Sequence, residues 1–278
     1  MLRKPGVLAV PAPFSAFTPL HGGGHGAPLV CVHGFTDTWR TWELVLASLE
    51  SRHDVLAPTL PGHAGGPSLP ARLTEETMAD AVERAMDAAG FETAHLVGNS
   101  LGGHIALRLA ARGRARSVVA FAPAGGWRPG SRAAADMLRS FPAMQQQARA
   151  ALPHLDRLVA TPEGRRRATE LICEHGDELP AALVAHLLLG VAACSGVDRL
   201  TEAALTLPWE LEAAAIECPV RIVWGLRDRV LRWPGAAVRY REEWLPNADW
   251  VELDGVGHCP QLDVPAVAAD LIAGFTPQ

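Results

Sequence analysis

The sequence predicts an α/β fold in which helices flank a mostly parallel β-sheet, with one helical insertion. Short apolar runs bounded by turn residues alternate with helical spacing through the first 125 residues, and such runs resume near residue 219. Between residues 131 and 212 the spacing is helical, with no convincing strand. We therefore expect one core domain made of residues 1–125 and 213–278, and a helical cap at 126–212.

The expected strands share an apolar centre and a turn at one end. They are 28–32, 54–57, 93–97, 117–121, 219–224 and 250–253. Helical spacing predicts helices at 79–89 and 105–112. The segment Leu179 to Val197 carries no charge and is long enough to span a bilayer. Leu183, Leu187 and Val191 recur every four residues, which favours a helix buried against protein.

Composition excludes several classes of protein. The chain of 278 residues is 49% hydrophobic, which suits a packed core and excludes global disorder. Its net charge of −5 gives no basic surface, so we expect no nucleic-acid partner. Lys4 is the single lysine, which argues against a buried lysine as base or Schiff-base former.

Localisation is predicted from the cysteines and the N-terminus. The five cysteines are scattered without a C-x-x-C pair, which favours a reducing compartment over a disulfide framework. Met1-Leu2-Arg3-Lys4 resembles the start of an export signal, but Pro5, Pro11 and Pro13 interrupt the next stretch of chain. We expect a cytoplasmic protein without a membrane span.

The strongest chemical signal is Gly98-Asn99-Ser100-Leu101-Gly102, a G-x-S-x-G placed directly after an expected strand and before an expected helix. In that setting the serine sits on a strained turn, with the flanking glycines avoiding clashes, and its hydroxyl stands above the sheet edge. A serine is a weak nucleophile by itself, so it needs a base and a group that orients the base.

Asp228 and His258 each follow an expected strand, and the order Ser, Asp, His is typical of open α/β sheets. His258 follows a glycine-rich turn late in the chain, whereas other histidines compete with it for the role of base. These competitors are His33, His63 and His104. Four carboxylates compete with Asp228. They are Asp198, Asp249, Asp254 and Asp263.

Acyl transfer also needs two backbone N–H groups for the developing oxyanion. We expect one from Leu101, directly after the nucleophile. The other is expected from Phe35, because Gly34 permits the turn that points its N–H inward. His21-Gly22-Gly23-Gly24 matches the H-G-G-G of certain lipases but precedes the strand, and it is interpreted as a flexible hairpin turn.

Five features together resemble the α/β-hydrolase superfamily over nearly the whole chain. They are His33-Gly34-Phe35, the loop 57–63, the elbow 98–103, Asp228 and Gly257-His258. The resemblance implies an α/β-hydrolase fold, a mostly parallel central β-sheet flanked by helices with an inserted helical cap. It further implies Ser100 as nucleophile, His258 as base, Asp228 as orienting acid, and Phe35 and Leu101 as oxyanion donors. It implies no cofactor and no metal.

The leading hypothesis is a serine hydrolase that cleaves carboxylic esters of small to medium apolar substrates through an acyl-enzyme. The substrate pocket is expected between the sheet edge and the cap. We expect it to be lined by Trp127, Met137, Leu138 and Phe141. The expected partner is a small-molecule substrate, and the sequence is compatible with a homo-oligomer.

Several functions compete with ester hydrolysis. A serine at the elbow argues against the haloalkane dehalogenase and epoxide hydrolase branches, whose nucleophile is an aspartate. The Gly-Asn-Ser elbow is similar to that of hydrolases that cleave carbon–carbon bonds in ring-fission products, but Cys259 stands where those have a tryptophan. The sequence is also compatible with a lactonase, a thioesterase or a non-catalytic ligand-binding protein of this fold.

Overall fold

The computed structural model describes residues 16–277, and the segment Met1-Leu2-Arg3-Lys4 lies outside the described residues. A seven-stranded sheet has the order β1-β3-β2-β4-β5-β6-β7. Only β1 is antiparallel to its neighbour, so the predicted mostly parallel sheet is confirmed. The strands are β1 (Leu20–Gly24), β2 (Ala27–Val32), β3 (His53–Pro58), β4 (Ala94–Asn99), β5 (Ala115–Phe121), β6 (Val220–Gly225) and β7 (Asp249–Leu253).

The prediction of a flexible hairpin turn at His21-Gly22-Gly23-Gly24 is wrong. These residues form most of β1, which pairs with β3 from Leu20 opposite Pro58 to Gly24 opposite Asp54. Backbone hydrogen bonding to β3 holds this edge strand, although its glycines have a low strand propensity.

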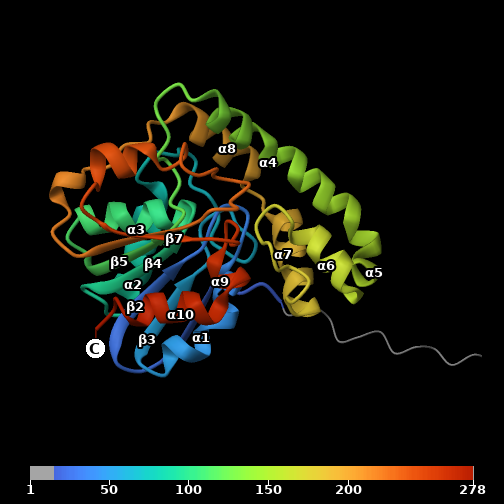
Figure 1. The fold of residues 1–278 in the computed structure, drawn as a ribbon, viewed down its shortest axis with the longest axis horizontal. Coiled ribbons are helices and arrows are strands. Elements are labelled where there is room, and N and C mark those ends of the chain that lie inside the picture. Colours follow the sequence, from blue (N-terminus) through green and yellow to red (C-terminus); the bar gives the residue numbers. More distant parts are fainter. Residues whose placement is uncertain (1–15, 278) are drawn as a thin grey trace, which may run out of the picture.

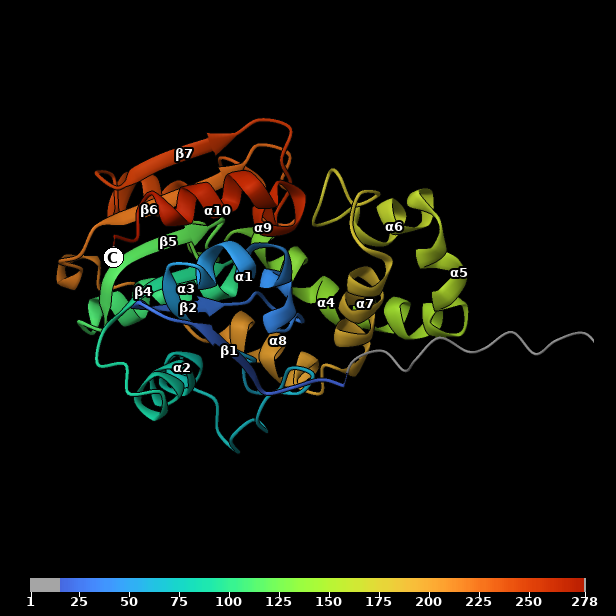
Figure 2. The same ribbon diagram turned by 90° about the horizontal axis from the view of Figure 1, so that it is seen from below.

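Helices cover both faces of the sheet (Figures 1 and 2). Alternate residues of β2 enter different cores, because successive side chains of a strand point to opposite faces. Leu29 and Cys31 pack with α1 and α10. Val30 and Val32 pack in the core that includes α2 and α3. The helices of these layers are α1 (Glu43–Glu50), α2 (Thr77–Ala88), α3 (Leu101–Ala111) and α10 (Pro265–Ala273).

Short helical segments complete the core domain. They are the 3₁₀ turns Trp39–Trp42 and Ala213–Ala215, the π-helical turn Tyr240–Trp244, and α9 (Pro260–Asp263).

The chain between β5 and β6 is helical and lies near the carboxyl ends of the strands (Figure 2). Its helices are α4 (Arg132–Ala151), α5 (Leu155–Ala160), α6 (Pro162–Thr169), α7 (Ala181–Ala193) and α8 (Val197–Thr206), with a 3₁₀ turn at Leu152–His154. We call this part the insertion. A third apolar cluster joins it to the core, since Leu183 of α7 and Leu262 of α9 belong to the same cluster.

The uncharged segment forms α7, a break and the start of α8. Within residues 16–277 no single helix is long and apolar enough to cross a membrane. The pair α7 and α8 passes that test by length and composition, with a bend of 73° between them.

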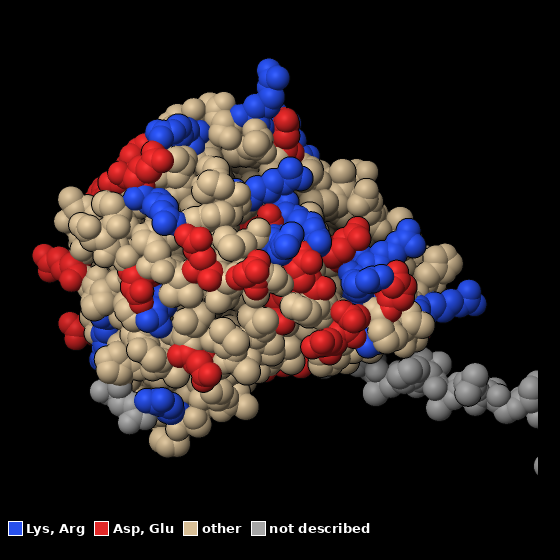
Figure 3. All heavy atoms as spheres, viewed as in Figure 1, with Lys and Arg blue, Asp and Glu red and all other residues tan. Residues whose placement is uncertain are grey.

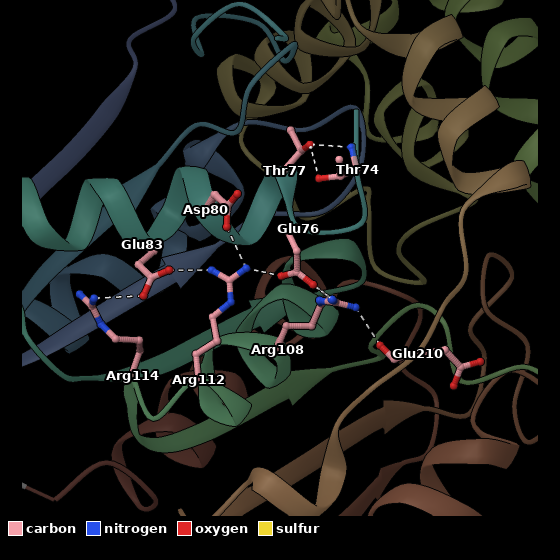
Figure 4. Close-up of polar contacts among 9 residues, drawn as sticks. All are labelled: Thr74, Glu76, Thr77, Asp80, Glu83, Arg108, Arg112, Arg114 and Glu210. Carbon is pink, nitrogen blue, oxygen red and sulfur yellow. Dashed lines mark hydrogen bonds and ion pairs between the residues drawn. The ribbon is translucent and has the colours of Figure 1, made fainter. Parts of the chain in front are cut away.

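An ion-pair network joins α2 to α3 and to the start of β5 (Figure 4). Arg112 bonds to Asp80 at 2.8 Å and to Glu83 at 2.6 Å, and also pairs with Glu76. Glu83 accepts a second bond from Arg114 at 3.1 Å. Elsewhere on the face drawn in Figure 3, acidic and basic side chains are interspersed. A network of this kind fixes two helices more firmly than an isolated surface pair.

Candidate active site

Ser100 occupies a strained turn between β4 and α3. Its backbone φ of 56° and ψ of −117° lie outside the regions that most L-residues adopt. Two backbone hydrogen bonds hold this conformation: the N–H of Ser100 donates to Phe121 O at 2.9 Å, and its carbonyl accepts from Ala124 at 3.0 Å. The strain is thus balanced by bonds to the last residue of β5 and to the loop that follows it.

The glycines of the elbow are required by close backbone approach. A Cβ on Gly98 would lie 2.1 Å from the carbonyl oxygen of Gly102, and one on Gly102 would lie 2.0 Å from that of Val32. Backbone cannot yield at such distances, so only glycine fits at these positions.

His258 and Asp228 meet beside this elbow. The Nδ1–H of His258 donates to Oδ2 of Asp228 at 2.7 Å, which leaves Nε2 as the unprotonated nitrogen of the neutral ring. Oδ1 of Asp228 accepts from the backbone N–H groups of Val230 and Leu231 at 2.8 and 2.7 Å. These bonds fix the carboxylate, and through it the plane of the imidazole.

Ser100 and His258 line one and the same cavity. No hydrogen bond joins their side chains within the described part of the chain. In enzymes of this kind the bond between nucleophile and base is often long without substrate and tightens when substrate binds.

The competing histidines occupy other places. Both ring nitrogens of His33 are engaged, Nδ1 with Gly34 O at 2.7 Å and Nε2 with the N–H of Leu60 at 2.8 Å. Burial lowers the pKa of His63 to about 4, and its Nδ1 faces the carbonyl of Pro61. His104 lies one helical turn beyond Ser100.

None of the competing carboxylates bonds to the His258 ring within the described residues. Asp263 is buried and accepts from Gly257 N at 2.7 Å and from His175 N at 2.6 Å. It thereby connects the loop that carries His258 to the insertion. The other three are partly or fully exposed to solvent. They are Asp198, Asp249 and Asp254.

The two expected oxyanion donors flank the elbow. Within residues 16–277, no acceptor bonds the backbone N–H of Phe35 or that of Leu101. The carbonyl of Gly34 is held by the His33 ring and by the N–H of Asp37 at 3.4 Å. Because a trans peptide directs its N–H opposite to its carbonyl, these bonds aim the Phe35 N–H away from His33. His33 therefore helps to orient the peptide between Gly34 and Phe35, whereas the sequence pattern indicated a competing base.

Asn99, which the sequence pattern did not single out, contacts the loop that carries His258. Its Nδ2 donates to Phe121 O at 3.2 Å and to His258 O at 3.0 Å. Its Oδ1 accepts from Gln261 Nε2 and from the thiol of Cys259, both at 3.3 Å. The available signal is a polar residue that directly follows the apolar run Leu96-Val97-Gly98. Burial raises the pKa of Cys259, so its thiol stays protonated and acts as a donor.

Residues 29–271 match the Alpha/beta hydrolase family. The chain belongs to that family. The protein is thus a hydrolase of the α/β-hydrolase type, and the resemblance inferred from its motifs is confirmed.

Individual relatives of this α/β-hydrolase differ in their named activities. It is 36% identical over 208 residues to epoxide hydrolase EphH of Mycobacterium tuberculosis, covering 73% of this chain and 95% of the relative. It is 38% identical over 115 residues to 2-hydroxymuconate semialdehyde hydrolase of a Pseudomonas species, covering 39% of this chain and 40% of the relative. Among solved structures, a bacterial membrane phospholipase A superposes with a TM-score of 0.70 at 26% identity, covering 92% and 81% of the two chains.

Two cavities of this α/β-hydrolase meet at Ser100. The first lies between α3 and the insertion helices α4 and α8, and encloses about 930 Å³ that is partly open to solvent. All four residues predicted for the pocket line it. They are Trp127, Met137, Leu138 and Phe141.

The second cavity, of about 830 Å³, is lined by Asp37, Ser100, Leu187 and His258 among others. Phe35 and Phe141 line both cavities, and their rings pack edge to face with centroids 4.6 Å apart. This aromatic pair lies at the boundary of the cavities, and Ser100 is accessible from both.

Charge is distributed unevenly between the cavities. Enclosure of Asp37 raises its pKa to about 6, because desolvation penalises the carboxylate, while bonds from Thr38 and Thr41 oppose that rise. Among residues 16–277, no Lys or Arg lines the second cavity. Arg108 lines the first, but it donates to Glu210 O at 2.9 Å and pairs with Glu76. In the part of the chain that the structure describes, no cluster of three or more His, Cys, Asp or Glu could hold a metal ion.

Proposed function

We propose that this protein hydrolyses neutral carboxylic esters with apolar acyl groups through an acyl-enzyme on Ser100. The observation that supports this most strongly is the bond from His258 Nδ1 to Asp228, 2.7 Å long, because it leaves Nε2 free on a residue that lines the same cavity as the strained Ser100. A base oriented in this way and a nucleophile on an elbow are the elements that acyl transfer requires.

The reaction follows from these groups. Ser100 Oγ attacks the ester carbonyl carbon while His258 Nε2 takes its proton, and Asp228 stabilises the imidazolium that forms. The backbone N–H groups of Phe35 and Leu101 hold the oxyanion. The carbon–oxygen bond to the alcohol then breaks, with the proton passing from His258 to the leaving oxygen. Water, deprotonated by His258, cleaves the acyl-enzyme by the same steps in reverse order.

The lining of the two cavities supports an assignment of the ends of the substrate. A general acid must reach the leaving oxygen, and His258 lines the second cavity but not the first. The alcohol therefore occupies the second cavity. The acyl chain occupies the first, which is lined mainly by apolar side chains such as Leu138 and Ile105.

The charge distribution favours neutral substrates over the ring-fission dienoates cleaved at a carbon–carbon bond. A dienoate carries a carboxylate, which would need a cation in the site. The second cavity instead presents Asp37, and the Arg108 guanidinium of the first is engaged by protein acceptors.

Epoxide hydrolysis is the second candidate, because of the likeness to the mycobacterial epoxide hydrolase. An aspartate that opens an epoxide forms an ester, which water can cleave at its carbonyl. Attack by Ser100 would form an alkyl ether, which has no carbonyl and would trap the enzyme. The serine at the elbow therefore favours an acyl substrate.

The test compares wild type with Ser100→Ala on 4-nitrophenyl esters, on styrene oxide and on a ring-fission dienoate. We expect ester cleavage by wild type and a loss on the order of 10⁴ to 10⁶ in turnover in the variant. A fluorophosphonate probe should label wild type and the control Ser117→Ala, whose serine is buried on β5, but not Ser100→Ala. Cleavage of the epoxide or the dienoate alone, or an unreactive serine as in a non-catalytic binding protein, would overturn the proposal.

A further inference from the structure

His104 is a buried polar side chain in the wall of the first cavity. It lies on α3, and its N–H donates to the carbonyl of Ser100 at 3.2 Å, so it stands one helical turn from the nucleophile. One turn corresponds to a rise of about 6 Å along the helix. The ring packs edge to face against Trp209, with centroids 5.1 Å apart.

The tautomer of His104 follows from its bond to Tyr240. The Tyr240 hydroxyl donates to the carbonyl of Ala124 at 2.7 Å, and a carbonyl can only accept. Burial raises the pKa of Tyr240, so the phenol keeps its single proton. In the contact of 2.9 Å between Nδ1 of His104 and the Tyr240 oxygen, Nδ1–H is therefore the donor. Nε2 of the neutral ring is left as an acceptor.

The position of Tyr240 is fixed by the backbone. It begins the π-helical turn, in which the N–H of Leu245 donates to Tyr240 O at 2.8 Å. Burial also lowers the pKa of His104 to about 4, so the ring is neutral near pH 7.

Nε2 of His104 opens into the first cavity. It bonds to no described residue, and it is not among the buried polar atoms that lack a partner, so it remains accessible. The residue as a whole is only 5% exposed, and it lines this cavity. An acceptor thus faces a space that is otherwise mainly apolar.

We propose that His104 is a specificity-determining residue whose Nε2 accepts a hydrogen bond from a hydroxyl group on the acyl chain, one helical turn from the scissile carbonyl. The inference rests on the proposed ester hydrolysis for its assignment of the acyl chain to this cavity. It narrows the substrate class to esters of acids whose chain is apolar except for one hydroxyl several bonds from the carboxyl carbon. If the acyl chain carries no hydroxyl, Nε2 of His104 stays unpaired when that acyl chain displaces water from the cavity.

The experiment uses 4-nitrophenyl 6-hydroxyhexanoate and 4-nitrophenyl heptanoate, which are isosteric and differ only in a terminal hydroxyl or methyl. The readout is the ratio of the two kcat/KM values. In His104→Asn the amide nitrogen replaces Nδ1 and preserves the contact with Tyr240, but nothing replaces Nε2. We expect the ratio, hydroxy over alkyl, to fall about tenfold. In His104→Gln, an amide oxygen can reach the place of Nε2, and we expect much of the preference to be retained.

The matched control is His95→Asn, because His95 is equally buried but bonds to Ser117 and Pro277 away from the cavity. Its ratio should equal that of wild type. An unchanged ratio in His104→Asn, or an equal fall in His95→Asn, overturns the role of His104 while ester hydrolysis stands.

A binding measurement separates the two proposals if wild type cleaves neither ester. The uncleaved amides 6-hydroxyhexanamide and heptanamide are titrated while tryptophan fluorescence is recorded, since Trp127 and Trp209 both line the cavity. If wild type binds the hydroxy amide more tightly and His104→Asn does not, the result supports the role of His104 as a hydrogen-bond acceptor independently of catalysis. Equal affinities overturn it.

Discussion

The amide of Asn99 donates to the backbone carbonyl of His258, so the residue before the nucleophile holds the loop that carries the base. The same side chain contacts Phe121, Cys259 and Gln261. One buried amide thus joins the end of β4, the end of β5 and the start of α9. The relative position of Ser100 and His258 depends on it.

Substitution of that amide should reduce turnover more than substrate binding. Asn99→Asp retains the acceptor for Gln261 but places an oxygen against the carbonyls of Phe121 and His258. We expect kcat to fall by about tenfold or more with little change in KM, and the free energy of unfolding to fall by about 1–3 kcal/mol. Steady-state kinetics and urea unfolding measure both quantities. A rise in KM alone would show that Asn99 does not position the base.

Substitution of the two buried carboxylates near His258 should have different effects: one should mainly lower kcat, and the other should mainly lower stability. Asp228→Asn removes the acceptor of Nδ1–H and favours the wrong tautomer, so we expect kcat to fall on the order of 10³ to 10⁴. Asp263→Asn leaves that bond intact but replaces one of the two acceptor oxygens with an NH₂ group, which then opposes the N–H of either Gly257 or His175. We expect a loss of about 2–4 kcal/mol in stability and a smaller loss of kcat. The reverse pattern would assign the orienting role to Asp263.

Removal of the aromatic boundary between the two cavities should change the preferred length of the substrate's acyl chain. Phe141→Ala removes one ring of the pair with Phe35, so the two cavities should merge. We expect the preferred acyl chain in a series of 4-nitrophenyl esters to lengthen, with a stability cost of about 3 kcal/mol. Phe91→Ala is the matched control, since Phe91 is similarly buried but lines neither cavity. An unchanged length profile in Phe141→Ala would place the acyl chain elsewhere.

Buried histidines predict that mild acid destabilises the fold. Burial lowers the pKa of His63 and His104 from 6.5 to about 4, and that of His33 well below its ordinary range. Between pH 6.5 and 4 the unfolded chain therefore binds more protons than the folded protein. The free energy of unfolding keeps its full value above pH 6.5 and falls progressively toward pH 4. Each such proton contributes a slope of up to ~1.4 kcal/mol per pH unit.

The raised pKa of Asp37 acts in the opposite direction between pH 6 and 3.8, and offsets about one histidine. Urea unfolding at pH 7, 6 and 5 measures the net slope. His63→Asn should reduce that slope by the contribution of about one proton. His25→Asn, at an exposed position, should leave the slope unchanged. A free energy of unfolding that is constant from pH 7 to 5 would contradict the prediction.

The parts of the fold that were predictable have strong local signals. The apolar run at β2 is buried on both faces, and the tight approach around Gly98 and Gly102 leaves a sequence motif because no other residue fits. The strand β1 was misinterpreted because its glycines carry no strand pattern, and its pairing with β3 is a backbone interaction.

The parts of the site that could not be predicted depend on contacts between distant segments. Phe35 and Phe141 meet only after the insertion folds over the core, and nothing in either segment indicates the partner. The same holds for Asp263 with His175, and for Tyr240 with His104. For His33, the sequence identified a functional position but not its role, because the ring nitrogens are engaged by Gly34 and by Leu60.

The bridge through Asp263 has a consequence for engineering. Because one carboxylate binds both the loop of His258 and the backbone of Glu174 and His175, the insertion is not an independent module. A chimaera that replaces residues 126–212 with the corresponding segment of another hydrolase would leave a buried carboxylate without two of its donors. Such a graft needs either the native loop around residue 174 or a neutral residue at position 263.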